Sequence, residues 1–180
     1  MRDTSVMDQK TENADEVLKY IPSLRAYARG LTRNADDADD LVQETLVKAI
    51  ANISKFQPGT NLGAWLFTIM RNSFLTDVRK RTREKPGTKD CVSATPVSYP
   101  SHETYITGQR LFASIAKLPP HYREILLLVV VIGESYEDTA AICGCAVGTI
   151  KSRVNRARKM VMEDLGTTDI LEILDVTPRS

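Results

Sequence analysis

Apolar residues recur at intervals of three and four along most of the chain, which places them on one face of a helix. This pattern predicts an all-α protein with no need for a sheet. The expected helices cover residues 15–31, 38–53, 62–83, 104–118, 121–132, 135–143 and 147–162.

Capping and breaking residues set the ends of the first two helices. Pro22 falls early in the segment 15–31, where a helix tolerates proline best, and Gly30 is expected to weaken or end that helix. Asn34 or Asp36 can cap the next helix. Its buried stripe is then expected to be Ala38, Leu41, Val42, Thr45, Leu46, Ala49, Ile50 and Ile53.

A turn at Pro58–Gly59 leads into the helix 62–83, which Thr60 or Asn61 can cap. Its apolar face is expected to be Trp65, Leu66, Ile69, Met70 and Val78. Its far end carries more cations than the helix dipole requires: Arg71, Arg79, Lys80, Arg81, Arg83 and Lys85.

Aromatic and amide side chains accompany those cations, namely Phe67, Asn72 and Phe74. Flat side chains can stack on unpaired bases while cations hold the phosphates, so the segment suits single-stranded nucleic acid. A solvated helix end is the plainer interpretation of Arg79–Arg83. For Trp65, a position in the core and a position against a base both stay open.

Proline, glycine, serine and threonine dominate the segment after Glu84, where the helical spacing disappears. This composition predicts a flexible linker between two small helical domains. The predicted divisions are a frayed N-terminus (1–13), a first domain (14–83), the linker (84–105), a second domain (106–166) and a tail (167–180). The apolar residues of the tail fit either a short added helix or a partner-bound segment.

The clearest motif lies between Ser135 and Lys159 and predicts a helix, a tight turn and a second helix. Ser135 can cap the first helix together with Asp138, and Gly144 supplies the positive φ of the turn. The second helix has an apolar face made of Val147, Ile150, Val154, Ala157 and Val161. No acid occurs from Val147 to Met162, and a helix that is apolar behind and basic in front fits a DNA groove. Solvated surface helices, the alternative, usually mix both signs of charge.

Composition narrows the class of protein. Among the 180 residues 42% are hydrophobic, which is enough for real cores, and the formal net charge is only +1. Any nucleic-acid surface must therefore come from local segregation of charge. Three cysteines, the absence of a signal-like N-terminus and of any long apolar run indicate a cytoplasmic protein without a membrane span.

Catalytic and metal chemistry is not expected. There is no phosphate-binding glycine loop, catalytic triad or paired-carboxylate cleft, so an enzyme with a cofactor or a small-molecule substrate is excluded. Cys143 and Cys145 flank Gly144, but they lack a second ligand pair at a zinc-site spacing. We expect Cys143 to pack and Cys145 to lie in the turn, with no metal.

A group of polar residues lies off the buried stripe of the second helix: Asp39, Asp40, Gln43 and Glu44. Asp36 and Asp37, at the helix start, are explained by the helix dipole. For the residues deeper in the helix, a protein-docking face and plain solvation are both open interpretations.

Three blocks together resemble the signature of extracytoplasmic-function (ECF) bacterial RNA polymerase sigma factors of the sigma-70 family: Asp36–Thr45, Gly63–Asn72 and Val147–Arg158. The resemblance spans residues 14–165, in the right order and with a linker in the right place. The stretches Pro58–Leu62 and Leu118–Glu124 resemble the general-stress-response group of alphaproteobacteria.

The resemblance implies partners and roles. The partners would be bacterial core RNA polymerase, promoter DNA and an anti-sigma factor, the last of which would cover the polymerase-docking surfaces. Docking on the polymerase would involve Asp39, Asp40, Gln43 and Glu44. Reading of the −35 element would involve Thr149, Lys151, Ser152, Arg153 and Arg156. Recognition and melting of the −10 element would involve Phe56, Asn61, Trp65, Phe67, Arg71, Asn72, Arg79 and Lys80.

One residue departs from the family's pattern. Members often have Ser or Thr just before the second helix of the motif, where this chain has Ala146, and losing that cap costs about 1 kcal/mol. Two other functions stay open. A stand-alone helix-turn-helix regulator would leave the segment 56–83 unexplained, and a sigma-like decoy for an anti-sigma factor would not need the acid-free basic helix.

Overall fold

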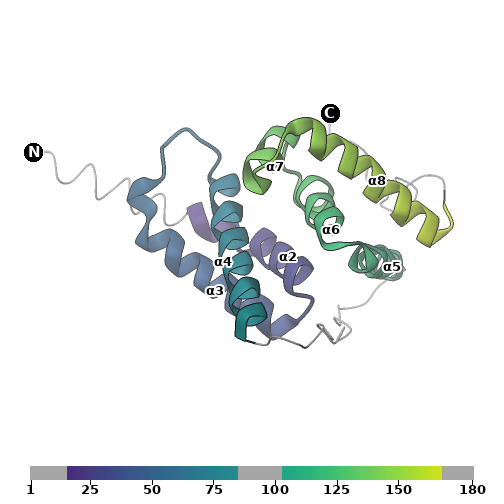
Figure 1. Cartoon of the computed structure of the whole chain (residues 1–180), viewed down its shortest axis with the longest axis horizontal. Helices are drawn as coiled ribbons and strands as arrows, with labels where there is room; N and C mark the ends of the chain where they lie inside the picture. Colours follow the sequence, from purple (N-terminus) through teal and green to yellow (C-terminus); the bar gives the residue numbers. More distant parts are fainter. Residues whose placement is uncertain (1–15, 85–102, 168–180) are drawn as a thin grey trace, which may run out of the picture. The chain divides into compact units, whose positions relative to one another are not determined.

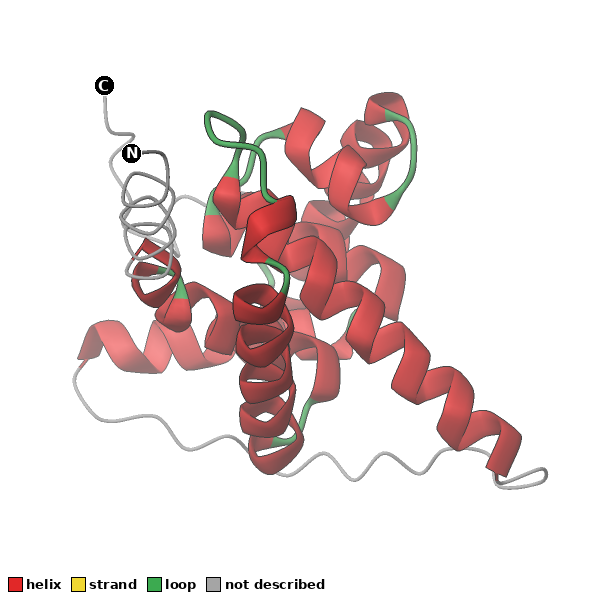
Figure 2. Cartoon of the chain, turned by 90° about the vertical axis from the view of Figure 1, so that its left-hand side faces the viewer, coloured by secondary structure: helices red, strands yellow, loops and turns green. Residues whose placement is uncertain are grey.

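A computed structural model describes residues 16–84 and 103–167 of the chain. The predicted frayed N-terminus, nearly all of the linker and the tail after Thr167 lie outside the described residues. Every regular element in the two described ranges is a helix (Figure 2), as the apolar spacing predicts. The chain divides into two compact units, one made of residues 1–95 with 141–144 and the other of residues 96–140 with 145–180. The all-α, two-domain prediction is thus confirmed.

The first unit contains α2 (Ile21–Thr32), α3 (Ala35–Ala51), a 3₁₀ turn η1 (Ile53–Lys55) and α4 (Leu62–Glu84). The three α-helices all pack against one another (Figure 1). At the centre, the rings of Tyr27 and Phe67 meet edge to face with centroids 5.5 Å apart, and neither ring is exposed. Burying such a side chain stabilises a fold by about 1.5–3 kcal/mol, so this pair fixes how α4 faces α2.

The core pair corrects the predicted apolar face of α4. The buried residues are Leu62, Gly63, Leu66, Phe67, Met70 and Ser73. Trp65 and Ile69 are only half-buried, and Val78 is 40% exposed. The buried face of α4 is therefore shifted around the helix by about one residue from the predicted face. This shift brings Phe67 into the core and places Trp65 at the edge of the core.

The ends of α2 also differ in part from expectation. The helical turn at residues 16–19 is interrupted at Tyr20, and α2 then starts with Pro22 in its first turn. Proline fits there because the backbone N–H groups of a first turn have no acceptor within the helix. Gly30 lies inside α2, which ends when Arg33 takes a left-handed conformation with φ of 59°. The predicted stop at Gly30 is wrong.

The buried stripe of α3 is confirmed at Ala38, Leu41, Val42, Thr45 and Ala49, with Ile53 buried in η1. The Thr45 hydroxyl donates to the Leu41 carbonyl at 2.7 Å, so this buried polar atom is satisfied. The prediction for Ile50 is wrong, because its side chain is 53% exposed. Leu46 is half-buried.

The second unit contains α5 (Glu103–Lys117), α6 (Pro120–Leu126), the π-helical η2 (Leu127–Ile132), the first part of α7 (Tyr136–Cys143) and α8 (Val147–Leu165). The long helix α8 packs against α5 and α6. Their shared core consists of Leu111, Ile115, Leu118, Ile125, Leu126, Leu128, Ile150, Val154, Ala157 and Val161.

One apolar side chain of this unit stays at the surface, and one expected helix needs correction. Phe112 of α5 is 38% exposed. The segment 121–132 is not one α-helix, since its second half is π-helical before Gly133 ends it with φ of 87°. The widened turn leaves Val129 to Ile132 only half-buried.

Candidate nucleic-acid and protein interfaces

The predicted helix-turn-helix forms with the expected capping groups. The Ser135 hydroxyl accepts from the Asp138 backbone N–H at 2.9 Å and donates to the Asp138 carboxylate at 2.8 Å. Gly144 takes a φ of 64°, and the Cys145 N–H donates to the Ala140 carbonyl at 3.0 Å across the turn. The local sequence thus fixes where α7 ends and α8 begins.

The helix α8 separates an apolar side from a basic side. Ile150, Val154, Ala157 and Val161 are fully buried. Of the five residues predicted to read DNA, Lys151, Ser152 and Arg156 are exposed, while Thr149 and Arg153 are half-buried. Ala146 caps the helix with extended backbone and no side-chain acceptor, as the sequence predicts. Arginine and lysine on such a helix can contact guanine edges and phosphates in the major groove.

The first unit carries an open depression of about 450 Å³ between α3, η1 and α4. It is lined by Lys48, Asn52, Lys55, Trp65, Ile69, Asn72, Ser73 and Thr76. An indole, two ammonium groups and two amides therefore meet in one place. Such a set can stack on a base, bind its edge and hold its phosphate.

Trp65 owes its position to Phe56. The two rings are tilted, with centroids 5.5 Å apart, and Trp65 is half-buried while Phe56 is only 8% exposed. The two alternatives for Trp65 thus combine, since one part of the indole packs and another lines the depression. Phe56 is corrected from a direct DNA contact to a support for Trp65, because so little of its ring reaches the surface.

The prediction that Phe67 contacts the −10 element also needs correction. Its ring is fully buried against Tyr27, so it cannot stack on a base unless the core opens. Residues 65 and 67 both lie on α4, and only their rotation about the helix axis separates a surface role from a core role. We remove Phe67 from the candidate nucleic-acid surface.

The other predicted −10 residues are spread along α4, from its cap to its last turns. Asn61, rather than Thr60, caps the helix, because its side-chain oxygen accepts from the Ala64 N–H at 3.0 Å. Asn72 is exposed at the depression and Arg71 is half-buried. Arg79 and Lys80 are exposed on the last turns. Next to them Arg81 contacts Asp37 at 3.3 Å, which links the end of α4 to the start of α3.

The start of α3 is capped by Asn34, whose side-chain oxygen accepts from the N–H groups of Asp36 and Asp37. Of the predicted polymerase-binding residues, Asp40 and Gln43 are exposed. Asp39 lies 3.8 Å from Arg25 of α2, and Glu44 accepts from Lys48. The structure therefore brings all four together on one helix, with two of them already paired.

Sequence reasoning missed two apolar members of this face. Val47 is 67% exposed and Ile50 is 53% exposed, one and two turns beyond Gln43. Val47 lies outside the predicted buried stripe. An apolar residue in such a position is the sequence signal that could have identified this surface. Together with Gln43 they form a surface of mixed polarity, which is typical of protein interfaces.

Membrane spans and clusters of metal ligands are both missing from the part of the chain that the structure describes. Within residues 16–84 and 103–167, no helix is long and apolar enough to cross a bilayer. In the same ranges, no three or more His, Cys, Asp or Glu side chains gather as ligands for one ion. Cys143 and Cys145 are half-buried, lie on either side of Gly144 and are not joined in a disulfide.

Two family models match the chain. They are Sigma-70 region 2, over residues 17–84, and Sigma-70, region 4, over residues 108–161. The first match covers the depression and the polar face of α3, and the second covers the helix-turn-helix. Both interfaces therefore lie inside matched regions. The predicted domain boundaries at 14–83 and 106–166 stay predictions.

Individual relatives match over most of their length. The ECF RNA polymerase sigma factor EcfG of Rhodopseudomonas palustris (strain TIE-1) is 53% identical over 163 residues, which cover 86% of this chain and 90% of that protein. The ECF RNA polymerase sigma factor SigC of Mycobacterium tuberculosis (strain CDC 1551 / Oshkosh) is 38% identical over 143 residues, covering 74% and 72%. The sigma factor RpoE of Bartonella quintana, crystallised with the anti-sigma factor NepR, superimposes with a TM-score of 0.75 at 44% identity, covering 88% and 99%.

Proposed function

Because the chain belongs to the ECF RNA polymerase sigma factors, we propose that it directs core RNA polymerase to stress-response promoters in the cytoplasm. It acts by binding and carries out no bond chemistry of its own. The observation that supports this most is the presence of two different basic surfaces, one on each unit. The exposed face of α8 suits duplex DNA, and the depression beside Trp65 suits an unpaired strand.

The −35 element is read by α8. Lys151, Ser152 and Arg156 face solvent and are free of the packing that holds Ile150 and Val154. Thr149 and Arg153, at the border of the exposed face, contact the DNA backbone beside them. A good bidentate contact from arginine to a base contributes about 1–3 kcal/mol of discrimination.

The −10 element is recognised and melted at the first unit. Trp65 stacks on an unpaired base and Asn72 bonds to its edge, while Arg71, Arg79 and Lys80 hold the strand's phosphates. Unstacking costs a few kcal/mol per step, and stacking on an aromatic side chain returns about 1–3 kcal/mol per base. Binding of the unpaired strand can therefore offset melting. Asn61 and Phe56 act indirectly, by fixing the start of α4 and the indole.

The polymerase binds to α3. Asp40 and Gln43 provide polar contacts there, Asp39 and Glu44 provide charge, and Val47 and Ile50 provide apolar area that water would otherwise cover. An anti-sigma factor covers this same face to hold the protein inactive. The support for that regulation is the fold shared with RpoE, which was crystallised with an anti-sigma factor.

A linker between the two units has a simple physical benefit. Once one unit is bound, the tether keeps the other at a high effective concentration near its own element, and it does so without rigid spacing. Neither unit then needs high affinity by itself.

Reconstitution tests this function. The purified chain is mixed with bacterial core polymerase, and the complex is isolated by gel filtration and assayed for transcription on promoter DNA. The expected result is a stable complex and transcripts that depend on the added chain. A chain that never binds the core enzyme would contradict the proposal, and a footprint on duplex DNA without polymerase would favour a stand-alone regulator.

A further inference from the structure

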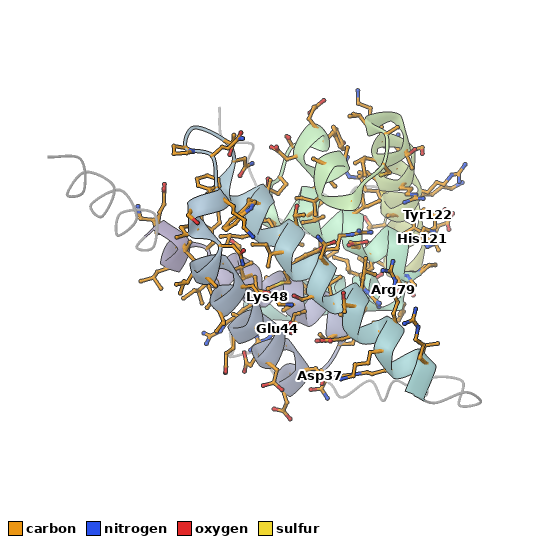
Figure 3. The ribbon with its side chains drawn as sticks, turned by 60° about the vertical axis from the view of Figure 1, so that its left-hand side comes forward. Asp37, Glu44, Lys48, Arg79, His121 and Tyr122 are labelled. Carbon is orange, nitrogen blue, oxygen red and sulfur yellow. The ribbon has the colours of Figure 1, made fainter. Side chains whose placement is uncertain are left out.

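Lys48 touches both of the surfaces proposed for the first unit. Its ammonium donates to the carboxylate of Glu44, one turn earlier on α3, and to the Ser73 hydroxyl of α4 at 2.9 Å. Figure 3 shows Glu44 and Lys48 together where α3 runs beside α4. Ser73 is 3% exposed, so it is a fixed point for the long lysine side chain.

The two partners of Lys48 belong to different proposed surfaces. Glu44 belongs to the polar face of α3 that we assign to the polymerase. Lys48 and Ser73 line the depression with Trp65 and Asn72, which we assign to the unpaired strand. Lys48 is thus placed where an event at one surface can alter the charge presented at the other.

The ion pair can exchange partners. The Lys48 and Glu44 side chains are 47% and 39% exposed, and a solvent-exposed pair at this spacing is weak. An ammonium has three donors, so Lys48 can keep its bond to Ser73 while it leaves Glu44. As long as Glu44 is its neighbour, the carboxylate neutralises the charge that a phosphate in the depression would bind.

We propose that Lys48 couples polymerase docking to strand capture. When a cationic side chain of the polymerase takes Glu44, the Lys48 ammonium is released to bind a backbone phosphate of the unpaired strand beside Trp65. The inference rests on the proposed function of both surfaces. Coupling between binding sites is reciprocal, so a strand in the depression strengthens polymerase binding by the same factor.

Removing the Glu44 charge imitates its capture by a partner, and this can be tested without polymerase. The full chain and its Glu44→Gln variant are titrated against a fluorescein-labelled, single-stranded oligodeoxynucleotide of random sequence, about 12 nucleotides long, over a range of salt concentrations. Asp36→Asn is the matched control, because Asp36 is exposed, lies on the same helix and loses the same charge.

The expected result for Glu44→Gln is about twofold tighter binding than for Asp36→Asn, the size of a weak ion pair. Its salt slope steepens by about 0.7, as one added phosphate contact to a single strand requires. In a Lys48→Met background, Glu44→Gln changes the affinity and the salt slope no more than Asp36→Asn does. Circular dichroism and the thermal midpoint confirm that each variant is folded.

Equal affinities and equal slopes for Glu44→Gln and Asp36→Asn would overturn the coupling, and so would an effect of Glu44→Gln that survives in Lys48→Met. These outcomes leave the proposed function intact. The proposed function fails separately if the unmodified chain neither binds the oligonucleotide nor supports promoter opening with core polymerase.

Discussion

The Lys117 ammonium lies 2.8 Å from both carboxylate oxygens of Asp164 and so joins the C-terminal ends of α5 and α8. An anion near the end of a helix is unfavourable, because the helix dipole is negative there. The hydrogen bonds from Lys117 offset this and hold the pKa of Asp164 below its usual value of 3.8. The contact thus links α5 to the far end of the helix proposed to read the −35 element.

We expect Lys117→Met to raise the pKa of Asp164. The pKa of Asp164 is lower in the folded protein than in the unfolded chain. The ionised carboxylate therefore stabilises the fold at pH values above its unfolded pKa. This stabilisation is lost as the pH falls through the pKa of the folded protein. The difference in stability between the two proteins should therefore persist at neutral pH and shrink below pH 3.8. A carboxyl ¹³C NMR titration measures the pKa directly, with Lys19→Met as control. An unchanged Asp164 titration in Lys117→Met would contradict the role of this contact.

Asn34→Ala should destabilise the first unit by about 1 kcal/mol. The Asn34 side chain accepts from two backbone N–H groups at the start of α3, and alanine cannot replace that acceptor. Asn34→Asp keeps an acceptor and should stay close to the natural protein. Urea unfolding gives the comparison, and equal losses for both variants would show that the cap contributes nothing.

Ala146→Ser should stabilise the second unit, by about 0.5–1 kcal/mol. Ala146 already has the extended backbone of an N-cap, so a serine hydroxyl can accept from the first turn of α8 without backbone change. Chemical denaturation measures the gain, and Ala146→Gly serves as a control without a hydroxyl. If serine and glycine behave alike, the start of α8 is not limited by a missing cap.

The roles of Trp65 and Phe67 can be separated by the same substitution at each position. Phe67→Leu should lower stability by about 1–3 kcal/mol, because it disturbs the packing against Tyr27. Trp65→Leu should lower the affinity for single-stranded DNA by about 1–3 kcal/mol and cost less stability, since the indole is half-buried. Denaturation and oligonucleotide titration on both variants test this. The reverse pattern would restore Phe67 to the nucleic-acid surface.

Local signals in the sequence predicted the turn between α7 and α8 and the buried face of α8 well. The Ser135 cap and the Gly144 turn depend only on the chemistry of neighbouring residues, and the buried face of α8 repeats cleanly from Ile150 to Val161. The family was also predicted correctly, because three blocks in order carry more information than one motif.

The orientation of α4 could not be predicted in the same way. Trp65, Leu66, Phe67, Ile69 and Met70 form an almost continuous apolar run, so several faces fit the helical period equally well. The choice is made by Tyr27, a residue of another helix about forty positions earlier, which holds Phe67 inside. Val47 and Ile50 stay exposed for a similar reason, since none of the described helices of the first unit covers that side of α3.

We propose that this chain opens promoter DNA by holding an unpaired strand against Trp65 and Asn72. Permanganate mapping of unpaired thymines, on a promoter bound by core polymerase and the added chain, tests it most directly. Reactive bases are expected at the −10 element with the natural protein. They should be lost when Trp65→Leu is combined with Asn72→Ala, although the polymerase still binds. Unchanged reactivity in that double variant would contradict it.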